Sequence, residues 1–341
     1  MKIFRGSIIV SIIALIVAFI YGGWDALFIT AILAVLEISL SIDNAIVNAR
    51  ILERMSPTWQ KVFLTVGILI AVVGMRLIFP LLIVSVSAQM GPVRALRLAL
   101  EKGNPHQAGT YGYILHHAHP QIAAFGGMFL LMLALSFFFD KRAHTWLKLP
   151  EKVLQKIGHF PAANAIISLA LLLVASMTLT ENAQTILFAG LLGILTFMLV
   201  DGFGEMMSHS KAATSTAANF VIATGKAGLA LFLYLEVIDA SFSFDGVIGA
   251  FAITSDPIII LLGLGVIGAM FVRSLTLYLV KKGTLNELVY LEHGAHWAIL
   301  TLALLILGSI KWDIGEAITG LLGGVIIVVS FISSVLYNRK H

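Results

Sequence analysis

Long apolar stretches alternate with short polar segments along most of the chain. About ten of these stretches approach the roughly 20 residues that cross the hydrocarbon core of a bilayer. They cover residues 6–20, 24–48, 61–86, 121–139, 162–179, 184–207, 226–252, 257–280, 296–310 and 314–336. Spans in lipid must satisfy their own backbone hydrogen bonds, so the pattern predicts helices. We therefore expect an all-α polytopic membrane protein of about ten transmembrane helices, with residues 1–341 forming a single transmembrane domain.

Composition agrees with this class, since 59% of the residues are hydrophobic and only 12% are charged. The chain has no cysteine, which excludes disulfides and thiolate metal sites. Any metal would be held by oxygen or imidazole ligands. The net charge of +4 does not indicate a nucleic-acid partner, because no basic run with interleaved aromatic residues occurs.

The basic residues predict the topology. With the N terminus inside, sixteen of the twenty-two Lys and Arg residues fall in cytoplasmic segments, as the positive-inside rule requires. Both termini are thus predicted to be cytoplasmic. Residues 1–20 resemble a signal peptide but lack a clear cleavage site before Tyr21, so we expect them to remain as the first span.

An acidic pattern occurs twice inside the apolar sequence. The two copies read Glu37-x-Ser39-x-Ser41-x-Asp43-Asn44 and Asp239-x-Ser241-x-Ser243-x-Asp245-Gly246. An Asp at the centre of a membrane helix costs about 2.5–3.5 kcal/mol on insertion scales. Such residues indicate an ion path or a proton relay.

The two copies also predict an internal repeat. They align at an offset of 202 residues, and the span after each carries one arginine, Arg76 or Arg273. Because the second and seventh spans are an odd number of steps apart, the copies run antiparallel. This is the inverted repeat of many transporters, with predicted halves at residues 24–139 and 226–336.

The first copy does not fit one face of a straight helix. Glu37, Ser41, Asn44 and Asn48 fall on one stripe, whereas Ser39, Asp43 and Arg50 fall on nearly the opposite side. Either protein surrounds the helix, or the helix is unwound near Ser39 to Asn44.

The predicted site takes a hard divalent cation, which prefers carboxylate, hydroxyl and amide oxygens. Its candidate ligands are Glu37, Ser41, Asp43, Asn44, Asp239, Ser243 and Asp245. Four carboxylates against Arg76 and Arg273 leave a formal charge of −2, which one divalent cation or two protons would balance. We therefore expect metal-for-proton exchange. In the alternative interpretation the polar groups only pack helices together, and each arginine locks one carboxylate in a structural pair.

Other polar groups are interpreted more simply. Asp201 and Glu205 share a helix face at the cytoplasmic end of the sixth span, where they either feed cations to the site or are solvated. Residues 87–120 are predicted as an outer loop and residues 140–161 as a basic inner loop. In the outer loop, which also contains His106, three histidines lack the spacing of a structural zinc site: His116, His117 and His119. We interpret them as a surface cluster, with weak metal capture outside the membrane as the alternative, and we interpret His293 and His296 in the same way.

Around the paired motifs the sequence resembles the TerC family of integral membrane proteins, within the wider LysE-like transporter superfamily. The resembling stretches are residues 36–45, 239–247 and 250–257, with a looser match through 24–86 and 226–281. The resemblance implies a metal-ion exporter of the bacterial inner membrane, with manganese the best-supported cargo and some members linked to tellurite resistance or calcium. By matching position it implies metal ligands at Glu37, Asp43, Asn44, Asp239 and Asp245.

The sequence thus favours efflux of Mn²⁺, or of Ca²⁺ or a similar cation, by alternating access, and not an enzyme. Three alternatives stay open: a calcium/proton exchanger, a membrane scaffold in metal or tellurite stress, and an intramembrane hydrolase with paired carboxylates. The hydrolase is the weakest of these, because the sequence contains neither the Gly-x-Gly-Asp signature of intramembrane aspartyl proteases nor a Gly-x-Ser-x-Gly nucleophile motif. The expected partners are the divalent metal ion and the lipid bilayer; a homo-oligomer is left open.

Overall fold

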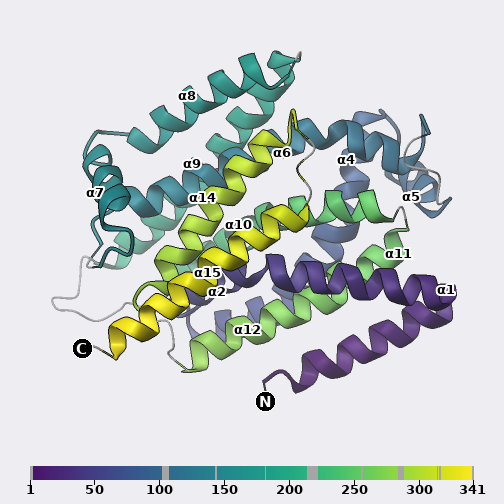
Figure 1. Ribbon diagram of the computed structural model, residues 1–341, viewed down its shortest axis with the longest axis horizontal. Helices are drawn as coiled ribbons and strands as arrows, with labels where there is room; N and C mark the ends of the chain where they lie inside the picture. Colours follow the sequence, from purple (N-terminus) through teal and green to yellow (C-terminus); the bar gives the residue numbers. More distant parts are fainter. Residues whose placement is uncertain are drawn as a thin grey trace.

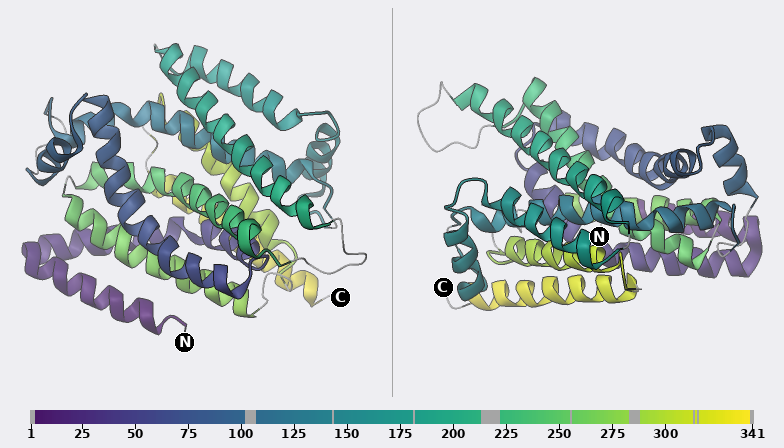
Figure 2. Two further views of the ribbon diagram at one scale, coloured as in Figure 1. Left: turned by 180° about the vertical axis from the view of Figure 1, so that it is seen from behind. Right: turned by 90° about the horizontal axis from the view of Figure 1, so that it is seen from above.

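The computed structural model describes residues 3–101, 107–142, 144–180, 182–212, 222–254, 256–282, 288–312, 314 and 316–339. Within these ranges the secondary structure is helical, and the β-type pairing is one isolated bridge between Met55 and Ala223. Long helices pack side by side, and further views show the same bundle from behind and from above (Figure 1, Figure 2).

Seven helices of the described residues are long and apolar enough to cross a membrane. They are Arg5–Val35, Pro57–Leu82, Tyr111–Phe139, Ala183–Gly202, Pro257–Lys281, Leu291–Gly308 and Leu321–Asn338. The prediction of an all-α membrane protein is confirmed, but the prediction of about ten spans is not. One reason is that α8 (Ala163–Thr178) has only 16 residues.

The first helix, α1 (Arg5–Leu40), is folded back on itself. Gly22 and Gly23 leave helical geometry, and Gly23 has φ +69°, a value that glycine adopts without a steric penalty. The two arms run beside each other in Figure 1, and Ala14 of one arm shares a buried cluster with Ala34 of the other. The first arm corresponds to the predicted stretch 6–20, and the second arm to the part of the stretch 24–48 that precedes Ser41.

The first copy of the acidic pattern contains a helix break. After α1 ends at Leu40, Ser41 has φ −98° and ψ 11°, and α2 (Ile42–Leu52) begins at the next residue. The break lies inside the segment predicted to unwind. The second copy differs, because α10 (Gly225–Ile253) continues through the whole pattern as a helix.

The two arginine-bearing helices share unusual local features. Each begins with a proline in its first turn, Pro57 or Pro257, and each contains π-helical turns. The first comprises α3 (Pro57–Val62), η1 (Phe63–Gly67), η2 (Ile70–Ile78) and α4 (Phe79–Ser87). The second comprises α11 (Pro257–Ile260), η3 (Leu261–Gly268) and α12 (Ala269–Lys282). Wide π turns of this kind often occur at functional sites.

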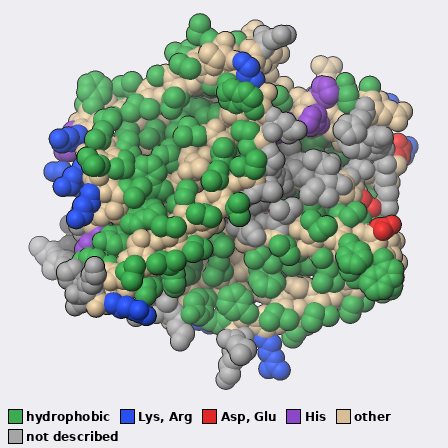
Figure 3. Space-filling view, viewed as in Figure 1, with side chains coloured by type: hydrophobic (Ala, Val, Ile, Leu, Met, Phe, Trp, Pro, Cys, Tyr) green, Lys and Arg blue, Asp and Glu red, His purple; other side chains and the backbone are tan. Residues whose placement is uncertain are grey.

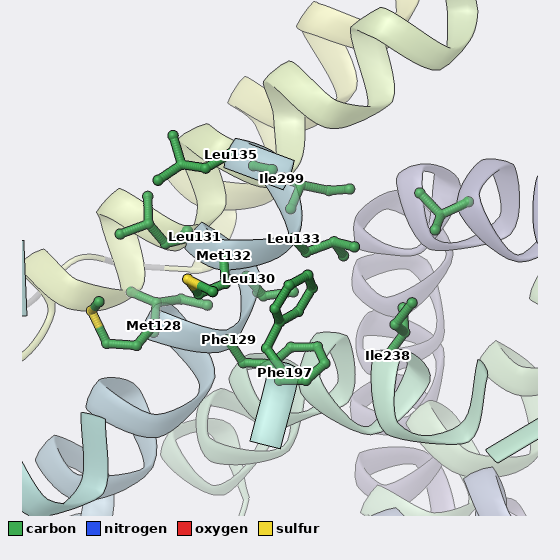
Figure 4. Packing of buried hydrophobic residues seen from close by; sticks show 14 of the residues in the cluster. Met128, Phe129, Leu130, Leu131, Met132, Leu133, Leu135, Phe197, Ile238 and Ile299 are labelled. Carbon is green, nitrogen blue, oxygen red and sulfur yellow. The ribbon is translucent and has the colours of Figure 1, made fainter. Parts of the chain in front are cut away.

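The core is centred on α6 (Tyr111–Phe139), most of whose side chains are buried. It packs against α9 (Ala183–Ala212) and α14 (Leu291–Gly308), and Figure 4 shows Phe129 of α6 against Phe197 of α9. The remaining helices are α5 (Pro92–Leu100), α7 (Lys148–Ile157), α8 and α15 (Glu316–Asn338). In Figure 1, α7 and the C terminus lie at one end of the bundle, and α5 and α11 lie at the other.

The segment predicted as an outer loop is partly helical. Thr110 caps α6 by accepting a hydrogen bond from the Tyr113 backbone N–H, so the helix starts before the histidine cluster. His116 and His117 are exposed on this first part of α6, as predicted for surface residues, and His119 is half-buried. His106 lies outside the described residues.

The surface of the bundle is that of a membrane protein. Apolar side chains cover much of the face in Figure 3, and Lys and Arg gather mainly at its margins. Many large apolar side chains are exposed on this surface, and Ile20 is 78% exposed. A continuous apolar surface of this extent is suited to lipid.

Close packing of α6 against α9 makes a glycine necessary. A Cβ atom added at Gly193 would collide with the Phe125 backbone carbonyl oxygen, which cannot move independently. We expect Gly193→Ala to destabilise the protein by about 1–3 kcal/mol through overpacking. Thermal unfolding in detergent measures this, with Gly324→Ala as the control because nothing lies within 4 Å of a Cβ there. Equal melting temperatures for the two variants would contradict the packing assignment.

A buried carboxylate anchors α7 to α14. Glu151 is 1% exposed and accepts hydrogen bonds from the Trp146 and Leu147 backbone N–H groups and from Trp297 Nε1, each at 3.1 Å. His293 Nδ1 lies 3.0 Å from Glu151 Oε2. The interpretation of His293 and His296 as surface residues is therefore wrong, since they are 5% and 7% exposed. Sequence spacing does not show that α7 covers this end of α14.

The anchor gives the fold a defined pH dependence. Burial alone raises the pKa of Glu151, but the nearby His293 ring and the hydrogen bonds from the Leu147 and Trp297 N–H groups outweigh it and hold the pKa below its ordinary value. A lowered folded-state pKa adds stability above the unfolded value of about 4.3, and that stability is lost as pH falls through the folded-state pKa. We expect the melting temperature of the wild type to fall more steeply below about pH 4.3 than that of Glu151→Gln. Superimposable pH profiles of the two proteins would contradict the anchor, and exposed Glu101→Gln serves as the control.

Candidate cation-binding site

The two copies of the acidic pattern meet where α2 lies against α10. Asn44 Nδ2 donates a hydrogen bond of 2.7 Å to Asp239 Oδ1, and Asn48 Nδ2 donates one of 3.3 Å to the same oxygen. The two asparagines are four residues apart on α2, so they share a face. Residues about 195 positions apart in the chain are thus joined by two hydrogen bonds to one carboxylate oxygen.

Beside this contact lies a buried ion pair. Glu37 and Arg76 are 5% and 4% exposed, and Arg76 NH2 is bonded to Glu37 Oε1. Ser41 Oγ donates to the same oxygen at 3.1 Å, and Arg76 NH1 donates to the Ala71 carbonyl oxygen at 2.7 Å. Buried charges require this degree of hydrogen bonding, because their desolvation is expensive. Arg76 therefore compensates the charge of Glu37.

A cavity of about 30 Å³ opens at the junction of these helices. This is room for one or two species of the size of water. Its polar lining comes from α2, η2, α10 and α12, and consists of Asn44, Asn48, Arg76, Asp239, Arg273 and Thr276. The structure thus brings both intramembrane arginines and residues of both acidic copies to one space.

Three buried polar atoms at the cavity have no hydrogen-bond partner among the described residues. They are Asn48 Oδ1, Arg76 Nε and Arg273 Nε. An orphaned buried polar atom costs about 1–3 kcal/mol unless water, an ion or a ligand satisfies it. Asn48 is only 1% exposed, so its acceptor oxygen can be reached only from within the protein.

Glu236 is a fifth carboxylate that the sequence interpretation missed. It precedes Asp239 by three residues on α10, which places both on one helix face. Its Oε1 is buried without a hydrogen-bond partner among the described residues, and it lies where a Cβ of Gly67 would be. Gly67 itself lines the cavity. The available signal was an additional acidic residue within the apolar stretch 226–252.

The side chains of several predicted site residues lie outside the described ones, namely Ser39, Asp43, Glu205, Ser241, Ser243 and Asp245. Asp201 lies half-buried on α9 and is not one of the described cavity residues. Within the described part of the chain, no three His, Asp or Glu side chains are grouped closely enough to hold a metal. Of the seven predicted ligands, the structure places Glu37, Ser41, Asn44 and Asp239 around the junction of α1, α2 and α10.

The described part of the chain has the fold of a helical integral membrane protein and contains a buried polar cavity. Residues 42–341 match the family described as "Protein of unknown function (DUF475)", and the chain belongs to that family. No curated protein and no solved structure matches the chain.

Proposed function

We propose that this protein is a divalent metal-ion transporter that moves Mn²⁺ or a similar cation out of the cytosol by alternating access. The observation that carries the proposal is the cavity, which Asn44, Asn48 and Asp239 line from the two acidic segments. Carboxylate and amide oxygens are the donors that Mn²⁺, Ca²⁺ and Mg²⁺ accept. The choice of manganese and the export direction rest on the resemblance to TerC proteins.

An inverted repeat of about ten spans is part of this proposal. It is supported by the pairing of α2 with α10 and by the matching helices that carry Arg76 and Arg273. In transporters of this architecture, substrate sites lie near the midplane between two related halves. We assign Asp43, Ser243 and Asp245 as further ligands, and Asp201 and Glu205 as the cytoplasmic access route.

The hydrogen bonds at Asp239 indicate how cargo would change the site. Asn44 and Asn48 donate their side-chain N–H groups to Asp239 Oδ1. A cation on Asp239 would repel those N–H groups and attract the amide oxygens instead. Rotation of the two side-chain amides would therefore accompany binding. Cargo would thus change the contact between α2 and α10.

Charge balance supports exchange with protons. Glu236 joins Glu37, Asp43, Asp239 and Asp245, and these five carboxylates against Arg76 and Arg273 leave a formal charge of −3 when all are ionised. One divalent cation leaves −1, and the carrier without cargo, at −3, would need protons or another cation to balance its charge. A calcium/proton exchanger would use the same chemistry with a different cargo, and a scaffold would need no flux at all.

Proteoliposomes test the proposal against these alternatives. Purified wild type is assayed for flux of Mn²⁺, Ca²⁺, Mg²⁺ and Zn²⁺, with and without a pH gradient, beside Asp43→Asn and Asp245→Asn. We expect Mn²⁺ flux that follows the pH gradient and is lost in both variants. Flux of none of the four cations, or flux that neither substitution alters, would contradict the proposed function.

A further inference from the structure

Helix α7 is held with one side against the protein. Glu151 points into the bundle, where it contacts His293 and Trp297 of α14. Because this side chain is 1% exposed, the rotation of α7 about its own axis is fixed. The residues on its opposite side are therefore directed away from the protein.

That opposite side carries an apolar row. Leu149, Val153 and Ile157 follow each other at intervals of four residues, and their exposures are 83%, 53% and 38%. At 3.6 residues per turn, the row is centred roughly opposite Glu151. Phe160, just after the helix, is exposed as well, at 63%. All three side chains of the row are exposed, Leu149 most and Ile157 least.

A row of lysines flanks the apolar row. The row consists of Lys148, Lys152 and Lys156, each of which directly precedes one residue of the apolar row in the sequence. All three lysines are exposed. Apolar and cationic rows side by side on a short helix are typical of helices that lie in the plane of a membrane interface. The apolar side chains enter the acyl boundary, and the lysines meet anionic headgroups.

The place of α7 in the fold suits this role. It joins the end of α6 to the start of α8 and crosses the end of the bundle, at a steep angle to the long helices (Figure 1, Figure 2). Lys and Arg side chains gather at this margin of the space-filling view (Figure 3). The helix thus lies beside the end of α6, where that span would leave the hydrocarbon.

We propose that α7 is an interfacial helix that binds anionic lipid headgroups at the bilayer surface. Contact with a second copy of the chain through this face is disfavoured, because it would bring two lysine rows together. Lipid provides both the negative charge and the apolar phase that the two rows need. The proposal does not depend on what the cavity transports.

A spin label on the apolar row tests the proposal in the full-length protein. The chain has no cysteine, so Val153→Cys introduces a single labelling site. In nanodiscs that contain phosphatidylglycerol, we expect the label to be accessible to oxygen and shielded from a water-soluble nickel chelate. In phosphatidylcholine nanodiscs this shielding should be severalfold weaker. Inorganic phosphate added to the phosphatidylcholine sample should not restore it.

Matched charge removal completes the test. Lys148→Gln, Lys152→Gln and Lys156→Gln combined should abolish the phosphatidylglycerol-dependent shielding. The combined control Lys61→Gln, Lys226→Gln and Lys281→Gln removes three other exposed lysines and should retain it. Thermal unfolding of each variant reports whether the fold is intact. A water-exposed label in both lipids, equal effects of the two triple variants, restoration by phosphate, or spin–spin broadening between copies would overturn the proposal.

Discussion

Asp239→Asn should reduce cation flux by roughly 100-fold or more. The substitution removes a negative charge from the cavity and places an amide where Asn44 and Asn48 already present N–H groups. In the loaded site the Asp239 carboxylate would pair with the cation, and loss of one partner from a buried ion pair costs about 3–5 kcal/mol. Each 1.4 kcal/mol corresponds to tenfold in affinity. The measurement is Mn²⁺ uptake into proteoliposomes, at equal amounts of folded protein.

Asp256→Asn is the matched control for Asp239. Asp256 is also buried, at 6% exposure, but it caps α11 through the Ile258 N–H and accepts a hydrogen bond from Tyr21. Asparagine remains a good N-cap and can still accept both bonds. We expect near-normal flux from this variant. Unchanged flux in Asp239→Asn, or equal loss in both variants, would contradict the assignment of Asp239 to the site.

Arg76→Met should be the most destabilising substitution considered for this fold. It removes the cation from the buried pair and leaves the Glu37 carboxylate without its charge partner. Breaking one side of a buried ion pair costs about 3–5 kcal/mol. Methionine keeps much of the arginine volume, so the loss reports charge more than packing. Denaturant unfolding in detergent measures the effect.

The double variant Glu37→Gln with Arg76→Met separates charge from other effects. It removes both charges, so we expect it to recover part of the stability lost in Arg76→Met, which a double-mutant cycle quantifies. Asp140→Asn is the surface comparison, because the Asp140 to Arg142 contact of 3.4 Å is largely exposed and contributes no more than about 1 kcal/mol. A loss for Arg76→Met as small as that for Asp140→Asn would mean that the pair is not buried in the native protein.

The sequence was sufficient to predict the all-α membrane class. The helix break in the first acidic copy was one of two alternatives that the sequence left open, because Glu37 and Asp43 cannot share one face of a straight helix. The closeness of Asn44 to Asp239 was implied by the repeat, whose two copies must meet if they form one site.

Other features depend on contacts that periodicity does not encode. Glu236 precedes the repeated pattern, so its place against Gly67 follows only from the crossing of α10 with η1. Asn48 was on the predicted polar stripe, but its role at the cavity depends on the register between α2 and α10. The burial of His293 depends on α7, which is more than a hundred residues earlier in the chain and covers α14 only in the folded protein.

The most direct test of the central claim is to locate the bound cation. Crystals of the wild-type protein grown with Mn²⁺ would be examined in an anomalous difference map at a wavelength where manganese scatters strongly. We expect a peak in the cavity, within coordination distance of Asp239. A cavity without a peak at Mn²⁺ concentrations that saturate flux, or a peak only at surface groups such as His116 and His117, would contradict it.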